Sequence, residues 1–238
     1  MKWVPDRSRR FESRPHYAPG ELDAECEQIV ESVLMKRHGS VMYPIGTEDL
    51  LFMLEREASV DLYADLDSAT GEVWGETEFL PGDKPYVRIL RRLAENDSYS
   101  NPLRTTITHE FGHVHYHGFM FAASQSSGNL FGLGEHATKT CKREHMERPK
   151  VSDWMEWQAN YCSGALLIPQ SAARRVVTDF LRANDIAAAK HGPASPAGLR
   201  LTSSVAKTFS VSEAAARVRL SQLGYLNEGS ENQKILLT

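Results

Sequence analysis

Residues Thr106 to His117 read TITHEFGHVHYH, and both the chemistry and the core of the fold are inferred from this segment. Within it, residues 109–113 match the pattern H-E-x-x-H. Residues four apart on a helix lie on one face, so the imidazoles of His109 and His113 can bind a single metal ion. Glu110 points about 100° round the helix from His109. From there it can accept a proton from the attacking water, which makes it the candidate general base.

A catalytic zinc site needs a third protein ligand and an open fourth position, and three candidates compete for that role. The long pattern H-E-x-x-H-x-x-G-x-x-H does not fit, because Tyr116 and Phe119 occupy the positions of its glycine and its third histidine. The second candidate is His117, or His115. On an ideal helix His117 lies about 80° from the direction of His109, so it is a poor ligand unless the helix ends early.

The third candidate is Glu156, at the start of a strongly periodic segment that runs from Trp154 to Ile168. A glutamate there can face the two histidines from a neighbouring helix and complete a two-histidine, one-glutamate site. Asn160 follows one turn later on the same face, where it can hydrogen-bond a ligand imidazole and fix its orientation. Such a ligand set suits Zn²⁺, and it also suits Mn²⁺ or Fe²⁺.

Three segments in a fixed order resemble one known family. They are HEFGH at residues 109–113, EWQANYCSGALLIP at 156–169 and VSEAAARVRLSQLG at 211–224. Together they resemble the ImmA/IrrE family of metallo-endopeptidases, which pairs H-E-x-x-H with a downstream E-x-x-A-N/D helix that ends in a Leu-Leu-x-Pro-like stretch. The resemblance covers residues 20–225 in order. At Cys162 the chain departs from the family, which often has an aromatic residue there.

The resemblance implies that His109, His113 and Glu156 bind the metal and that Glu110 is the general base. It implies a zinc-dependent endopeptidase whose protein substrate is a helix-turn-helix transcriptional repressor, often of a mobile element or a stress-response regulon. An alternative is a DNA- or protein-binding regulator whose metal site is structural or vestigial. A third interpretation is a toxin-like or defence peptidase that acts on other host targets.

Stabilisation of the tetrahedral oxyanion requires a further hydrogen-bond donor. Four side chains near the motifs have suitable chemistry, and the sequence does not choose among them: Tyr99, Tyr116, Tyr161 and His115.

The spacing of apolar residues predicts an α+β fold, with a mainly helical, zincin-like protease core, a small antiparallel sheet and a C-terminal helical pair. Helices are predicted over 20–37, from Thr47 as N-cap, from Asn101 to about 117, and over 154–168, 170–184, 199–209 and 212–223. Strands are predicted near 60–64, 73–80 and 86–90. The predicted parts are a loose lead-in over 1–19, a metallopeptidase domain over 20–190 with a variable insertion at 123–153, and a helix-turn-helix-like segment over 191–238.

The insertion contains His136, Cys141 and His145, whose spacing matches no common zinc pattern and is interpreted as that of ordinary loop residues. In the C-terminal pair, Ser210 and Glu213 fit the S-x-x-E capping signature. Arg217 and Arg219 are expected to project away from the apolar face of the last helix. This basic charge is sparse for DNA binding, so the pair is expected to pack on the protease or to present a substrate-docking surface.

The amino-acid composition argues against several other classes of protein. The chain has 238 residues, 41% hydrophobic and 24% charged, which is typical of a globular protein. Its 27 Lys and Arg against 31 Asp and Glu leave no overall basic charge that would drive nucleic-acid binding. No apolar run is long enough to span a membrane, and the N-terminus lacks a secretory apolar region. The three cysteines do not form a disulfide framework, so a reducing, cytoplasmic location is expected.

Overall fold

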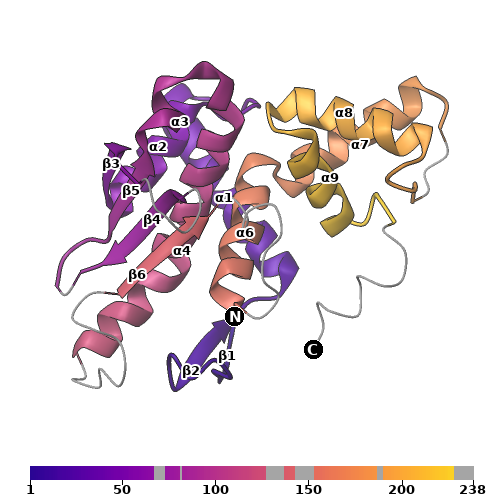
Figure 1. Ribbon diagram of the computed structural model, residues 1–238. Helices are drawn as coiled ribbons and strands as arrows, with labels where there is room; N and C mark the ends of the chain where they lie inside the picture. Colours follow the sequence, from indigo (N-terminus) through magenta and orange to yellow (C-terminus); the bar gives the residue numbers. More distant parts are fainter. Residues whose placement is uncertain (67–72, 81, 127–136, 143–152, 187–189, 228–238) are drawn as a thin grey trace. The chain divides into compact units, whose positions relative to one another are not determined.

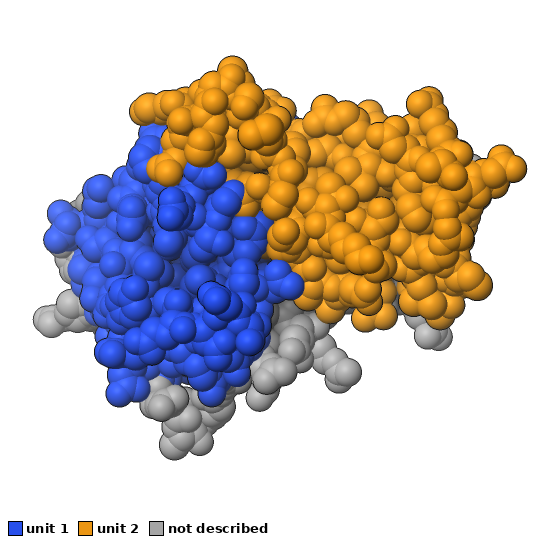
Figure 2. Space-filling view, turned by 90° about the horizontal axis from the view of Figure 1, so that it is seen from above, with its two compact units in different colours: residues 1–25, 46–163 blue, residues 26–45, 164–238 orange. Residues whose placement is uncertain are grey.

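The computed structural model describes residues 1–66, 73–80, 82–126, 137–142, 153–186 and 190–227. The chain divides into two compact units (Figure 2). Unit 1 comprises residues 1–25 and 46–163, and unit 2 comprises residues 26–45 and 164–238. The chain passes between the two units at residues 25/26, 45/46 and 163/164.

Unit 1 contains both sheets and the helix that carries the H-E-x-x-H motif (Figure 1). Its elements are β1 (Lys2–Pro5), β2 (Ser13–His16), the start of α1 (Pro19–His38), α2 (Thr47–Glu57), β3 (Ser59–Ala64), β4 (Val73–Phe79), β5 (Tyr86–Leu90), α3 (Arg91–Glu95), the 3₁₀ turn η1 (Asp97–Tyr99), α4 (Ser100–Ser126), β6 (Ala137–Lys142) and most of α6 (Trp154–Leu167). The predicted α+β, mainly helical fold is confirmed. None of the helices in the described ranges has the length and apolar character needed to cross a bilayer.

The larger sheet has the strand order β3-β5-β4-β6. Its strands β3, β4 and β5 lie where the sequence predicts them, and β6 adds a fourth within the predicted insertion. The predicted antiparallel pairing is wrong for β3, which runs parallel to β5, whereas β4 is antiparallel to both of its neighbours. Alternation of side chains reports the two faces of a strand but not its neighbour in the sheet, so the sequence could not reveal this arrangement.

Helix α4 packs against strands β4, β5 and β6. The strand residues on the inner face are buried, among them Thr77 and Val87, which are paired across β4 and β5. On the outer face Arg88 forms an ion pair with Glu76 at 2.6 Å. This alternation sets the register, and it directs Gly75 and Thr77 toward the helix. The helix extends to Ser126, beyond the predicted end near residue 117.

Helices α4 and α6 approach each other at backbone contact distance (Figure 1). A Cβ atom on Gly112 would lie 2.8 Å from the Cα of Ala159. One turn away, the hydroxyls of Thr108 and Ser163 are 2.7 Å apart. The two helices are antiparallel, because the earlier residue on α4 meets the later residue on α6. A glycine at 112 therefore permits the close packing that brings the second helix to the motif.

We expect Gly112→Ala to force α4 and α6 apart. The added methyl overpacks the contact, which costs about 1–3 kcal/mol of unfolding free energy and moves Glu156 away from the histidines, so zinc affinity falls with stability. Gly118→Ala is the matched control, since its Cβ would meet only ordinary contacts at 3.9 Å and gains helix propensity of up to about 1 kcal/mol. Chemical denaturation and zinc titration of both variants test this. Equal zinc affinity in the two would contradict it.

The N-terminal residues form a hairpin, not the loose lead-in that the sequence suggests. Strands β1 and β2 are antiparallel, and their connection is organised by Asp6, which is 7% exposed. Its carboxylate accepts hydrogen bonds from the backbone of Ser8, Arg10 and Phe11 at 3.0–3.2 Å and from Nε1 of Trp154 at 3.1 Å. An Arg- and Pro-rich segment lacks strand periodicity, so these polar contacts could not be inferred from the pattern.

Burial raises the pKa of Asp6, but hydrogen bonds from Ser8, Phe11 and Trp154 outweigh it and hold that pKa below 3.8. A lowered carboxyl pKa gives stability that is present above pH 3.8 and is lost as the pH falls through the folded value. We expect Asp6→Asn to reduce the unfolding free energy at pH 7 by about 1–3 kcal/mol. Thermal melts from pH 7 to pH 3 should show the difference from wild type shrinking. A constant difference would contradict the argument.

Unit 2 contains the later parts of α1 and α6 and three further helices: α7 (Gln170–Ala183), α8 (Pro196–Phe209) and α9 (Glu213–Gln222). The predicted C-terminal pair is confirmed, and α8 and α9 contact each other. The predicted cap is wrong by two residues. Ser212, not Ser210, is the N-cap of α9 and accepts from the backbone of Ala215, while Ser210 is the left-handed C-cap of α8 with φ 50°.

The expectation that Arg219 projects from the helix pair is also wrong. Its side chain is 1% exposed, and its Nε donates to the carbonyl of Ile168 at 3.1 Å. Ile168 directly follows the last residue of α6, where carbonyls are left over and a positive charge is favourable. Helical periodicity placed Arg219 off the apolar stripe, but its long stem is buried and its head serves as a helix cap.

Candidate metal centre

The structure brings together His109, His113 and Glu156, all buried in unit 1, with one ligand atom of each within 4.8 Å of the others. The two Nε2 atoms are 3.0 Å apart, and the carboxylate oxygens of Glu156 lie 3.4 Å from each of them. Ligand atoms on a tetrahedral ion with bonds of about 2.0–2.1 Å are about 3.3 Å apart. The three side chains therefore fit a zinc-sized ion.

The electrostatics of the three side chains also fit a cation. Burial by itself raises the pKa of Glu156, but His113 and His109 outweigh it and hold that pKa well below the usual range. The carboxyl is therefore ionised, and its Oε2 accepts no hydrogen bond from the described residues. A buried carboxylate facing two imidazole nitrogens is stabilised by a bound metal ion.

Asn160 lies one turn beyond Glu156 on α6 and reaches the first histidine. Its Oδ1 is 3.1 Å from Nδ1 of His109, so the Nδ1–H of that ring donates to the amide oxygen. This contact leaves Nε2 of His109 as the nitrogen available to a metal. Partners of metal-bound histidines commonly make a hydrogen bond of this kind.

Glu110 is fully buried and directed at strand β4. Its Oε2 accepts a hydrogen bond from the Thr77 hydroxyl at 2.6 Å, while its Oε1 accepts none from the described residues. Burial raises the pKa of Glu110 to about 7, against the lowering effects of His109 and Thr77. A carboxyl with a pKa near neutrality and one oxygen available can both accept and release a proton.

Gly75 on β4 makes room for that carboxylate. A Cβ atom at this position would lie 2.7 Å from Oε1 of Glu110 and 2.8 Å from the Thr106 methyl. Neither Gly75 nor Thr77 is among the site residues predicted from the sequence. A glycine inside a predicted strand indicates that another group approaches the backbone closely there. The role of Gly75 could therefore have been inferred from the sequence. The role of Thr77 could not, because it depends on the register of the sheet against α4.

His117 and His115, the other two candidates for the third ligand, are not in the group formed by His109, His113 and Glu156. Nδ1 of His117 is 3.1 Å from Nδ1 of His113, the nitrogen opposite the one that faces Glu156. His115 lies between Glu57 at 2.9 Å and Glu25 at 3.3 Å. Burial lowers the pKa of His115, but these two carboxylates outweigh it and raise that pKa to about 9.

Each of the four candidate oxyanion donors contacts another side chain of the protein. The hydroxyl of Tyr161 donates to Asp23 at 3.0 Å. His115 is held by its two glutamates, and Tyr116 packs edge-on against Tyr17. Tyr99 lies under the guanidinium of Arg92, which is 5.3 Å from the ring centroid.

The predicted insertion also contains His136, Cys141 and His145. The two histidines and the side chain of Cys141 lie outside the described part of the structure. Cys26 and Cys162 are buried thiols. Cys162 is fully buried on α6, at the position where the resemblance leads one to expect an aromatic ring.

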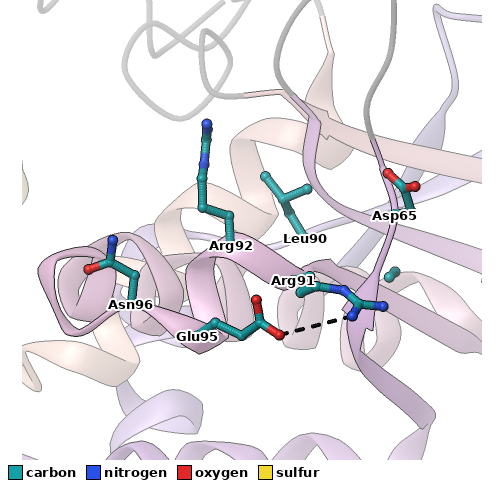
Figure 3. Close-up of a pocket in the computed structure, with 7 residues that line it drawn as sticks. Asp65, Leu90, Arg91, Arg92, Glu95 and Asn96 are labelled. Atoms are coloured by element: carbon teal, nitrogen blue, oxygen red, sulfur yellow. Dashed lines mark ion pairs between the residues drawn. The ribbon is translucent and has the colours of Figure 1, made fainter.

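A surface pocket of about 490 Å³ lies beside α3 (Figure 3). Its lining combines two apolar side chains with charged and amide side chains: Ala64, Asp65, Leu90, Arg91, Arg92, Glu95 and Asn96. Arg91 and Glu95 face each other at 4.0 Å along the helix, and both are more than half exposed. None of the pocket's residues belongs to the metal-binding group.

Comparison with protein-family models gives no match, and comparison with curated proteins gives none either. The likeness to the ImmA/IrrE family therefore depends on the three motifs alone.

We expect about one zinc ion per chain in protein that is loaded with zinc and then dialysed. Glu156→Gln keeps the size of the side chain but removes its charge, so zinc affinity should fall by about 10²-fold or more. His115→Gln removes a histidine from the same helix without touching the site, and its zinc content should match wild type. Elemental analysis and chelator competition measure both. Wild-type zinc affinity in Glu156→Gln would contradict the assigned ligand.

Proposed function

We propose that this chain is a zinc-dependent endopeptidase that hydrolyses a peptide bond in a protein substrate. One observation carries the proposal. A buried group of two histidines and a glutamate adjoins a second carboxylate, Glu110, one oxygen of which accepts no hydrogen bond from the described residues. A site built only to hold a structural ion does not need that second carboxylate.

His109, His113 and Glu156 would hold the ion. Zinc, when bound, lowers the pKa of a coordinated water toward about 7 and polarises the scissile carbonyl. Glu110 accepts the proton of the attacking water at Oε1 and passes it to the leaving amine. Thr77 contributes by holding Oε2, so that the other oxygen stays available for the proton.

The described residues supply three ligands, which favours a catalytic over a structural zinc, because structural zinc sites are closed by four. Manganese or iron would also suit two histidines and one carboxylate. We favour zinc because it prefers four-coordinate geometry, which agrees with the ligand separations of 3.0 to 3.4 Å.

The substrate class follows from the motif resemblance. The order of HEFGH, EWQAN and the C-terminal helices is similar to the ImmA/IrrE family, and on that basis we propose a helix-turn-helix transcriptional repressor as substrate. The alternative of a DNA-binding regulator is weaker. It depended on Arg217 and Arg219, and Arg219 is buried as a helix cap. The sparse cysteines suit the reducing cytoplasm as the place of action.

The decisive experiment is incubation with the repressor-like product of an adjacent gene, with and without a chelator. We expect cleavage that the chelator abolishes and that added zinc restores. Glu110→Gln should retain about one zinc per chain and lose activity by about 10²–10⁴-fold, because the proton acceptor is gone.

His115→Gln is the matched control and should cleave as wild type does. Normal cleavage by Glu110→Gln would refute the assigned base. Chelator-resistant cleavage would refute the metallopeptidase proposal as a whole.

A further inference from the structure

A chain of hydrogen bonds leads away from the metal-binding group through residues that the proposed chemistry does not use. It begins at His113, whose Nε2 faces His109 and Glu156. Its Nδ1 lies 3.1 Å from Nδ1 of His117. Two neutral imidazole nitrogens at this distance form a hydrogen bond only if one carries the proton and the other offers a lone pair. Geometry at this contact does not say which.

The last hydrogen bond of this series decides which nitrogen carries the proton. Nε2 of Gln158 donates to the backbone carbonyl of Pro15 at 3.0 Å. A carbonyl oxygen only accepts, so the amide must turn its NH₂ group toward Pro15 and its oxygen toward His117. The orientation of this amide is thus fixed by chemistry.

The proton positions then follow in order. Oε1 of Gln158 lies 3.0 Å from Nε2 of His117, and because that oxygen only accepts, His117 carries its proton on Nε2. Neutral His117 therefore offers the lone pair of Nδ1. The Nδ1–H of His113 donates to it, and Nε2 of His113 keeps the lone pair that a metal needs.

Burial prevents water from replacing any link. His113 and His117 are 0% exposed and Gln158 is 1% exposed. The ring of Trp154 packs edge-on against His117, with the centroids 5.4 Å apart, and restricts its rotation. The chain joins α4, α6 and strand β2, all within unit 1.

We propose that His117 is a positioning residue, which together with Gln158 and the Pro15 carbonyl fixes the proton of His113 on Nδ1 and thereby raises the metal affinity of the site. The inference rests on the proposed metal site, but not on peptidase activity. It assigns to His117, the last histidine of the segment HEFGHVHYH, a role that neither ligation nor acid–base chemistry gives it.

The test compares two substitutions at one position. His117→Leu removes the acceptor and puts an apolar side chain of similar bulk in its place. His117→Asn keeps an oxygen acceptor where Nδ1 stood. We expect the Leu variant to bind zinc about 10–100-fold more weakly than wild type in chelator competition, and the Asn variant to recover most of that loss. His115→Gln should match wild type. Equal affinity of wild type and His117→Leu, or equal loss in Leu and Asn, would overturn the proposal.

A second measurement does not depend on any variant folding. Nitrogen NMR of ¹⁵N-histidine-labelled wild type, with and without zinc, reports which nitrogen of each ring is protonated. We expect His117 to carry its proton on Nε2, with a coupling across the hydrogen bond to His113 Nδ1. A proton on Nδ1 of His117 would overturn the proposal. Protein that binds zinc but cleaves nothing would refute the proposed function and leave this inference intact.

Discussion

The grouping of His109, His113 and Glu156 depends on how closely α4 and α6 approach. Gly112 lies against the backbone of Ala159, where a side chain at 112 would collide. Because a glutamate side chain is short, it can reach two histidines on the other helix only when the helices are this close. The Thr108–Ser163 contact holds the helices in antiparallel register one turn away. Hydrophobic packing alone would leave the helices at a typical spacing of 8–10 Å, set by their side chains.

A second constraint acts from the sheet. Strand β4 turns Gly75 and Thr77 toward α4, so the strand leaves space for Glu110 and supplies its hydroxyl partner. The helix therefore presents one face to α6 and another to the sheet. His109 and His113 lie on the first, and Glu110 lies on the second. Burial between these layers raises the pKa of Glu110 toward neutrality, because a charged carboxylate is poorly solvated there.

The features that follow from a local pattern could be predicted from the sequence. The spacing of His109 and His113 on one helix is a property of the chain itself, since the helical repeat fixes it. The helices α7, α8 and α9 and the strands β3 to β5 follow from apolar periodicity. Contacts between residues that are far apart in the sequence could not be predicted. Arg219 caps α6 from 51 residues away, and Asp6 reaches Trp154 across 148 residues.

The sequence by itself determined the identity and spacing of the groups that can bind a metal and move a proton, because both motifs lie within single helices. Only the tertiary structure decided the rest. It brought Glu156 to the histidines and made Gly75 and Gly112 necessary. It also placed His117 against Nδ1 of His113 and not beside Glu156. Those outcomes depend on the register between helices and sheet, which is set by packing over the whole unit and leaves no short-range pattern in the chain.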